Sequence, residues 1–468
     1  MSWVVGKLWG FCNTLRHDGI GYGDYIEQLT YLLFLKIAQE KGVKLPNGCT
    51  WDHLKAKSGT ELLDTYLEIL RTLSKQKGML GDIFAGSLSK FREPVNLKKL
   101  IGLIDETQWT ALDVDIKADA YEGLLEKYAE EEKGAGQYFT PREAIRCVVR
   151  CVKPDFREKP DFTIHDPAVG TAGFLIGAYE WMMKQTKEGA LLARAERERL
   201  TKETFSGGEI VLDTRRLALM NLYLHEIEAD IYYGDALAEG PHTSKRYDIV
   251  MTNPPFGTKG AGQSPIRDDF TVKTANKQLN FVQHVMNILK PVGRAAMVVP
   301  DNVFFEENAG KEVRRLLMED CNLHTILRLP IGTFTPYSPG VKANIIFFRK
   351  GEPTKEVWFY DNRTNVEKIT IGRPLTANSF KAFEESLQAK PRKETERFRK
   401  FTREQIAKRD DNLDVFWLKD DTLGRTEEEA DPEEITSETL DQLQAATDAL
   451  NDVMEILATP KQVRRNRT

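Results

Sequence analysis

The stretch Phe162-Thr-Ile-His-Asp-Pro-Ala-Val-Gly-Thr-Ala-Gly-Phe-Leu175 combines a short apolar run, a glycine-rich turn and the start of an apolar helical pattern. The same succession recurs downstream. Further apolar runs lie at 204–206, 230–233, 247–251 and 294–299, and helical stretches lie at 173–187, 212–226, 279–290 and 309–319. Strand–helix alternation at this spacing predicts an α/β fold with a parallel, doubly wound sheet.

Two later runs, 323–329 and 343–348, follow each other without a helix between them. A short connection of this kind predicts an antiparallel pair at the edge of the sheet.

The regions on either side of this alternation have a different character. Residues 1–130 show helical apolar spacing, as at Ile26, Leu29, Leu33 and Ile37, and predict an all-helical domain. The sheet domain is expected at 131–378. Residues 379–468 are expected to form a charged linker, basic at 390–409 and acidic at 410–434, and then a helix at 435–457 that binds a partner.

The composition excludes several classes of protein. The chain has 468 residues, of which 66 are basic and 71 acidic, so a nucleic-acid-binding surface must be a local patch. The five cysteines include no CxxC pair, which argues against a disulfide framework or a zinc ribbon. We find no apolar run long enough for a membrane span and no signal peptide. We therefore expect a cytoplasmic protein that has no membrane contact.

The motif Asn253-Pro-Pro-Phe256 directly follows the run 247–251. An asparagine at the carboxyl end of a strand points into the crevice where open α/β sheets bind ligands. Pro254 and Pro255 restrict φ and lack N–H donors, so the motif presents acceptors that suit an exocyclic amino group. Phe256 offers a ring on which a planar group can stack. The alternative is a strand-ending turn with an incidental aromatic residue.

The turn Asp166-Pro-Ala-Val-Gly170-Thr-Ala-Gly173 opens a helix, and its two glycines allow the backbone to approach a ligand closely. Glu209, at the end of the next strand, can accept both hydroxyls of a ribose. Asp235, at the end of the third strand, can accept from an adenine amino group. Each carboxylate alone is equally well explained as part of a turn or a helix N-cap.

A third motif, Gly136-Gln-Tyr-Phe-Thr-Pro-Arg-Glu143, reads as the start of a helix. Thr140, Pro141 and Glu143 have the spacing of a capping box with proline at the first helical position. Tyr138 and Phe139 precede this cap and could wall a pocket for a sulfonium or a carboxylate at the helix N-terminus.

Taken in this order, Gly-Gln-Tyr-Phe-Thr-Pro, Asp-Pro-Ala-Val-Gly-Thr-Ala-Gly-Phe-Leu and Asn-Pro-Pro-Phe resemble the motifs of adenine-specific DNA methyltransferases. More closely, the chain resembles the modification subunit of type I restriction–modification systems over nearly its whole length. The resemblance implies a Rossmann-like methyltransferase sheet. One departure is Ala172, where many methyltransferases have glycine.

The resemblance also implies a cofactor, S-adenosylmethionine, and the residues of its site. The implied catalytic residues are Asn253, Pro254, Pro255 and Phe256. The implied cofactor-binding residues are Gln137, Tyr138, Phe139, Thr140, Pro141, Arg142, Asp166, Gly170, Thr171, Ala172, Gly173, Glu209 and Asp235. An adenine flipped from double-stranded DNA would be methylated at N6, without a covalent intermediate and without a metal.

The implied partners are a specificity subunit, clasped by two copies of this chain, and restriction subunits. We find no spare segment that could form a target-recognition domain between the Asn253 motif and the tail. Methylation of a protein glutamine, methylation of cytosine N4, and a non-catalytic scaffold remain as alternatives. The loop 257–264 is expected to order over the flipped base. Arg267, Lys273, Lys277 and the stretch 390–409 could contact phosphates or form ordinary solvated surface.

Overall fold

The computed structural model describes residues 19–109, 139–256, 267–335, 340–370 and 372–419, and the isolated positions 6, 9–12, 15, 123–125 and 338. Gln137, Tyr138, the loop 257–264 and the helix expected at 435–457 lie outside the described residues. Within the described part, no helix has both the length and the apolar character needed to cross a membrane.

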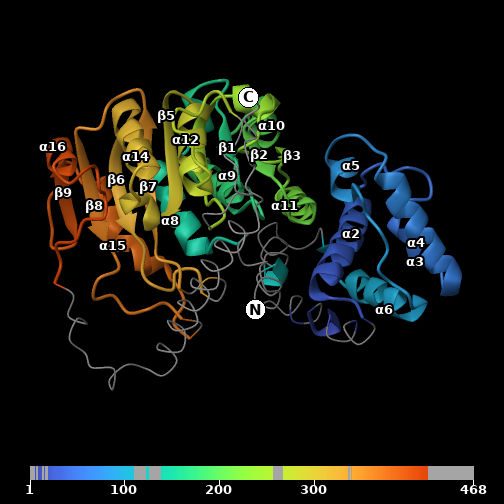
Figure 1. The fold of residues 1–468 in the computed structure, drawn as a ribbon. Helices are drawn as coiled ribbons and strands as arrows, with labels where there is room; N and C mark the ends of the chain where they lie inside the picture. Colours follow the sequence, from blue (N-terminus) through green and yellow to red (C-terminus); the bar gives the residue numbers. More distant parts are fainter. Residues whose placement is uncertain are drawn as a thin grey trace, which may run out of the picture.

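The N-terminal region is helical, as its apolar spacing predicts. Between residues 19 and 109 the elements are α2 (Tyr22–Glu40), α3 (Trp51–Lys55), α4 (Gly59–Leu73), α5 (Gly78–Phe84) and α6 (Pro94–Asp105). Twelve residues of α2 are buried, which agrees with a helix that is apolar over much of its circumference. These helices form a separate group on one side of the sheet domain (Figure 1).

The predicted alternation is present, and the first five strands fall within or beside the predicted runs. They are β1 (Ile164–Asp166), β2 (Phe205–Glu209), β3 (Asp230–Tyr233), β4 (Tyr247–Thr252) and β5 (Leu289–Pro300). The helices between them are α9 (Gly173–Gln185), α10 (Arg194–Lys202), α11 (Leu212–Leu224) and α12 (Lys277–Ile288). These five strands are parallel to their neighbours in the order β3-β2-β1-β4-β5.

The antiparallel pair is also present, but it does not end the sheet. β6 (Cys321–Arg328), after α14 (Ala309–Asp320), pairs antiparallel with β7 (Ala343–Lys350), and β7 lies next to β5. β8 (Glu356–Asp361) then adds in parallel to β6, and β9 (Phe398–Thr402) forms the outer edge. The expected edge position was wrong because Val357 and Phe359 of β8 add apolar side chains to the buried core of the sheet.

Residues 379–419 are part of the sheet domain, although they were expected to be a linker. They form η5 (Ala377–Phe380), α15 (Lys381–Gln388), β9 and α16 (Arg403–Ala407). Phe383 and Phe398 are buried despite the surrounding charges. The charged residues hide a short buried pattern, and for this reason composition alone places the end of the domain too early.

Alternate side chains along the central strands face different helical layers. In β4, Ile249 and Met251 join the core that contains α9, α11 and α8 (Arg142–Val152). Val250 joins the core formed with α12 and α14. This period of two places helices on both faces of the sheet, as a doubly wound fold requires.

The chain reverses its direction of travel across the sheet between β3 and β4. β1 pairs with β2 on one side and with β4 on the other, so the connections leave β1 and β4 in opposite directions. Such a switch point leaves a crevice at the carboxyl ends of the two strands. Asp166 ends β1 and Asn253 follows β4, so two of the predicted site residues lie at this crevice.

Candidate active site

A cavity of about 150 Å³ lies at this crevice and gathers residues from motifs far apart in the sequence. Its lining includes predicted residues from all three motifs and from both later strand ends. They are Phe139, Thr140, Arg142, Asp166, Gly170, Thr171, Gly173, Glu209, Asp235, Asn253 and Pro255.

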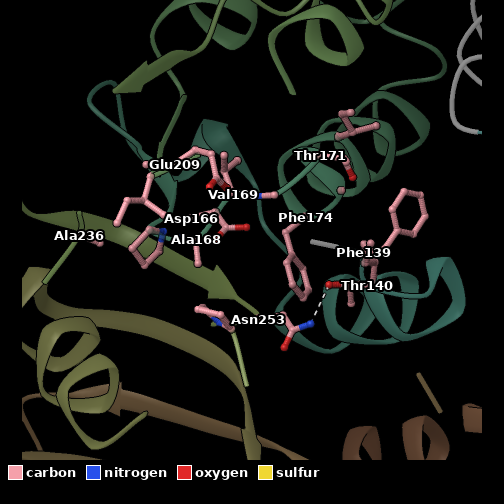
Figure 2. A pocket seen from close by; sticks show the side chains of 18 of the residues that line it. Phe139, Thr140, Asp166, Ala168, Val169, Thr171, Phe174, Glu209, Ala236 and Asn253 are labelled. Carbon is pink, nitrogen blue, oxygen red and sulfur yellow. Dashed lines mark hydrogen bonds between the residues drawn. The ribbon is translucent and has the colours of Figure 1, made fainter. Parts of the chain in front are cut away.

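Asn253 is held in one orientation by Thr140. Its Nδ2 donates to the Thr140 Oγ1 at 3.0 Å (Figure 2). Its Oδ1 is buried and has no hydrogen-bond partner in the structure. A buried acceptor without a partner costs about 1–3 kcal/mol, so this arrangement is suited to a donor brought by a ligand.

Two buried carboxyl groups line the same cavity. Asp166 Oδ1 accepts the N–H of Ala168 at 3.0 Å, and burial raises the pKa of Asp166 to about 7. Glu209 accepts the N–H groups of Gly170 at 3.1 Å and Val211 at 2.9 Å, and burial raises its pKa as well. The Glu209 contact therefore ties the end of β2 to the glycine turn after β1.

Asp235 lies at the mouth of the cavity. Its side chain accepts the N–H of Leu237 at 2.9 Å, which orders the turn after β3. Asp235 itself is exposed, so its second oxygen is open to a ligand. Among the described residues, no group of three or more His, Cys, Asp or Glu side chains is arranged to hold a metal ion.

The comparisons with known proteins agree with this geometry. The N-6 DNA methylase family model matches residues 112–422. The chain belongs to this family. It is 38% identical to the methylase subunit of type I restriction enzyme EcoKI from Escherichia coli (strain K12), with 97% of this chain and 95% of that protein covered. The StySPI methylase subunit of Salmonella potsdam is also 38% identical, over the same shares.

Solved structures from type I systems are similar to this N-6 DNA methylase chain. The crystal structure of the EcoKI M protein is 33% identical over 99% of this chain and 98% of that one, with a TM-score of 0.56. A chain from a structural study of type I complex assembly and conformational transition is 28% identical, with a TM-score of 0.73, over 97% and 98%. The protein is thus an adenine-specific DNA methyltransferase and a type I modification subunit, which confirms that resemblance.

The remaining predicted residues of this N-6 DNA methylase lie beside the cavity. Pro254 is buried and is not among the lining residues, and Pro141 is half-buried at the start of α8. Phe256 is half-buried and packs edge-to-face on Phe334, with the ring centroids 5.1 Å apart. Ala172 is fully buried with φ 69° and does not line the cavity, so the methyl group by which it departs from glycine does not narrow that space.

The predicted capping box at Thr140 is absent. α8 begins at Arg142, its N-cap is Pro141, and no side chain caps it. The Thr140 hydroxyl instead accepts from Asn253, from the other side of the crevice. A tertiary contact therefore displaces the local one that the spacing predicts.

Several residues of the site carried no signal of their own in the sequence. Phe334 follows β6 and contacts Phe256, and Asn221 and Phe281 lie on helices and line the cavity. Asn221 and Phe281 stand in helices that are buried over most of their surface, where a residue that lines a cavity cannot be distinguished by sequence from one in the core.

The basic residues suggested as phosphate contacts differ in whether they are buried or paired, or exposed. Arg267 is only 1% exposed and its guanidinium pairs with Asp269, so it is not available to a phosphate and that suggestion was wrong. In the stretch 390–409, Arg397 donates to backbone carbonyls and Arg403 pairs with Asp411. Lys277, by contrast, is exposed at the cavity.

Proposed function

We propose that this cavity binds S-adenosylmethionine and that Asn253 directs the amino group of a flipped adenine toward it. The observation that carries this proposal is the Asn253 amide. Asn253 lines the cavity, its NH₂ group is held by Thr140, and its oxygen is buried without a hydrogen-bond partner. An exocyclic amino group is the donor that such an acceptor requires.

The cofactor would be held along the ends of β1, β2 and β3. In this proposal Glu209 accepts the ribose hydroxyls, Asp235 accepts from the cofactor's adenine, and Gly170, Thr171 and Gly173 surround the methionine part. Arg142, Phe139 and Thr140 line the same space. Gln137 and Tyr138, which the resemblance adds to this wall, lie outside the described residues. S-adenosylmethionine supplies an electrophilic methyl group on a sulfonium.

The target adenine would be flipped from the duplex, because an enzyme cannot reach N6 inside the base stack. Asn253 Oδ1 and the Pro254 carbonyl accept the two N6 hydrogens and keep the nitrogen lone pair directed at the methyl group. Phe256 stacks on the ring, and its contact with Phe334 holds Phe256 in place. Catalysis then rests on orientation and on preorganised acceptors.

Replacing Asn253 by alanine tests this proposal. We expect Asn253→Ala to lower the rate of methyl transfer by about 10²–10³-fold, the usual effect of losing one preorganised polar group. Affinity for S-adenosylmethionine, measured by calorimetry, should change little. Asn287→Ala, which removes an amide that donates to Asp269 on the surface, is the control and should keep full activity. Undiminished transfer to adenine N6 by Asn253→Ala, read by mass analysis of nucleosides, would refute the role of this residue.

The last part of the proposal concerns the subunits that associate with this chain. We propose that two copies of this chain associate with one specificity subunit, which reads the DNA sequence, and that restriction subunits join them in the cytoplasm. Support comes from the relatives, which are named as subunits of type I restriction enzymes. Mass measurement of the complex purified with its genomic partners tests this stoichiometry, and any ratio other than two to one would contradict it.

A further inference from the structure

Asn221 resembles Asn253 in its surroundings, although the two lie on different elements. Asn221 belongs to α11, is 1% exposed and lines the same cavity. Its Nδ2 donates to the Thr171 carbonyl at 2.9 Å. Its Oδ1 is buried and has no hydrogen-bond partner in the structure. The donation to Thr171 sets the orientation of the amide, so the oxygen is the atom left for a ligand.

The hydrogen bond to the Thr171 carbonyl shows on which side of the cavity Asn221 lies. Ala236, beside Asp235, and Thr171 lie on opposite sides of the cavity (Figure 2). If the cofactor's adenine is at Asp235 and its ribose at Glu209, the side near Thr171 receives the methionine part. Asn221 is therefore at the amino-acid end.

The chemistry of the cofactor leaves one donor to which the proposed site has not yet assigned an acceptor. Glu209 takes the ribose hydroxyls and Asp235 takes the adenine amino group. Arg142 and Arg146 line the cavity, and their positive charge suits the methionine carboxylate. The remaining donor is the α-ammonium group, which needs an oxygen acceptor.

We infer that Asn221 is a binding residue for the α-ammonium group of S-adenosylmethionine. The inference rests on the proposed function, because it takes the cavity to be the cofactor site. A hydrogen bond from a charged donor to a buried oxygen is among the stronger ones in proteins. Asn221 would then help to select ligands that carry an amino acid over plain nucleosides.

Asp166 and Glu180 are the competing acceptors. Asp166 Oδ1 already accepts the Ala168 N–H, and burial raises the pKa of Asp166 to about 7, which favours its neutral form. Glu180 is the second competitor. It lines the cavity from α9, but its side chain is 34% exposed and lies 3.9 Å from His225. Water screens a partly solvated carboxylate and so reduces its advantage in charge over the buried and oriented oxygen of Asn221. We therefore assign the main contact to Asn221.

Three ligands separate the contributions: S-adenosylhomocysteine, its desamino analogue and 5′-methylthioadenosine, which lacks the amino-acid part. Binding to the full chain is measured by calorimetry. We expect Asn221→Leu to weaken the binding of S-adenosylhomocysteine by about 10–100-fold. The affinity for 5′-methylthioadenosine should stay within about twofold of the wild-type value. Asn280→Leu is the matched control, since Asn280 is also a buried helical asparagine whose amide donates to a backbone carbonyl. It should not change the ratio between the two ligands.

Several results would overturn the inference. One is an equal loss of both ligands in Asn221→Leu, and another is a larger loss in Glu180→Gln. If Asn221→Leu does not fold, the wild-type chain still decides, because equal affinity for S-adenosylhomocysteine and its desamino analogue contradicts an ammonium contact. Asn221→Asp, which keeps the acceptor, should retain the preference for the amino group. No binding of S-adenosylhomocysteine by the wild type would refute the cofactor site as a whole.

Discussion

Single side chains in this protein are positioned by partners distant in the sequence. Thr140 and Asn253 are 113 positions apart, yet their contact determines which atom of the Asn253 amide is left without a partner in the protein. Both the nitrogen and the oxygen of an amide can form hydrogen bonds, so a held nitrogen makes the oxygen the acceptor by geometry rather than by sequence.

Removing the Thr140 hydroxyl should therefore loosen Asn253. We expect Thr140→Val to reduce methyl transfer about tenfold, because the amide can turn and lose part of its orientation. Thr140→Ser keeps the acceptor and should restore most of the rate. The measurement is single-turnover transfer to DNA in the reconstituted complex. Equal rates for the valine and serine variants would show that the contact does not orient Asn253.

The raised pKa of Asp166 predicts that the stability of the folded chain depends on pH. Its pKa is about 7 in the folded chain, against an ordinary value of 3.8. At pH values between 3.8 and about 7, Asp166 is ionised in the unfolded chain but keeps its proton in the folded chain. The free energy of unfolding therefore falls as pH rises through this range. We expect a difference between the wild type and Asp166→Asn that changes by up to about 1.4 kcal/mol per pH unit in this window. Chemical unfolding at several pH values measures it, and parallel curves would contradict the raised pKa.

At the scale of elements, the outer part of the sheet shows how the fold ends. β9 is an edge strand, and edge strands are liable to pair with other chains. The Lys400 N–H donates to the Glu394 carboxylate at 3.0 Å, and Trp417 donates to the Glu396 carbonyl. The Glu394 side chain therefore occupies one N–H group of β9, and Trp417 fixes the segment just before the strand.

The loop after β6 depends on a glycine. Gly332 has a φ of +78°, and a Cβ atom there would lie 2.1 Å from the Ile369 carbonyl oxygen. We expect Gly332→Ala to reduce the free energy of unfolding by about 2 kcal/mol or more, from the positive φ and the backbone clash. Because the loop carries Phe334, methyl transfer should also fall. Gly372→Ala meets open space and should stay within about 0.5 kcal/mol of wild type by urea unfolding; similar losses for both would contradict the clash.

At the scale of the whole molecule, two arginines of α11 join the helical region to the sheet domain. Arg216 is 2% exposed, pairs with Glu27, and donates to the carbonyls of Ile83 at 3.0 Å and Ala85 at 2.7 Å. Arg215 pairs with Asp82. These contacts hold α2 and α5 against the helix that also carries Asn221.

Breaking this junction should be costly. We expect Arg216→Met to destabilise the chain by about 3 kcal/mol, because Glu27 and two carbonyls lose a buried partner. Lys202→Met removes an exposed pair with Glu198 and should cost less than about 1 kcal/mol. Urea unfolding of both variants provides the measurement. A loss for Arg216→Met as small as that for Lys202→Met would show that the junction contributes little.

The order of strands and helices from residue 162 to 350 was largely determined by the sequence alone. Apolar periods of two and of about 3.6 are local properties, and the motifs fall at strand ends because turns follow strands. For the same reason, the positions of Asp166, Glu209 and Asn253 along the chain were enough to assign all three residues to one crevice.

Only the tertiary structure decided which residues meet across the chain. It extended the sheet with β8 and β9, buried Arg267, and gave the Thr140 hydroxyl to Asn253 rather than to a helix cap. It also brought Asn221 to the cavity. These contacts join residues far apart in sequence and depend on burial, which no local pattern of side chains encodes.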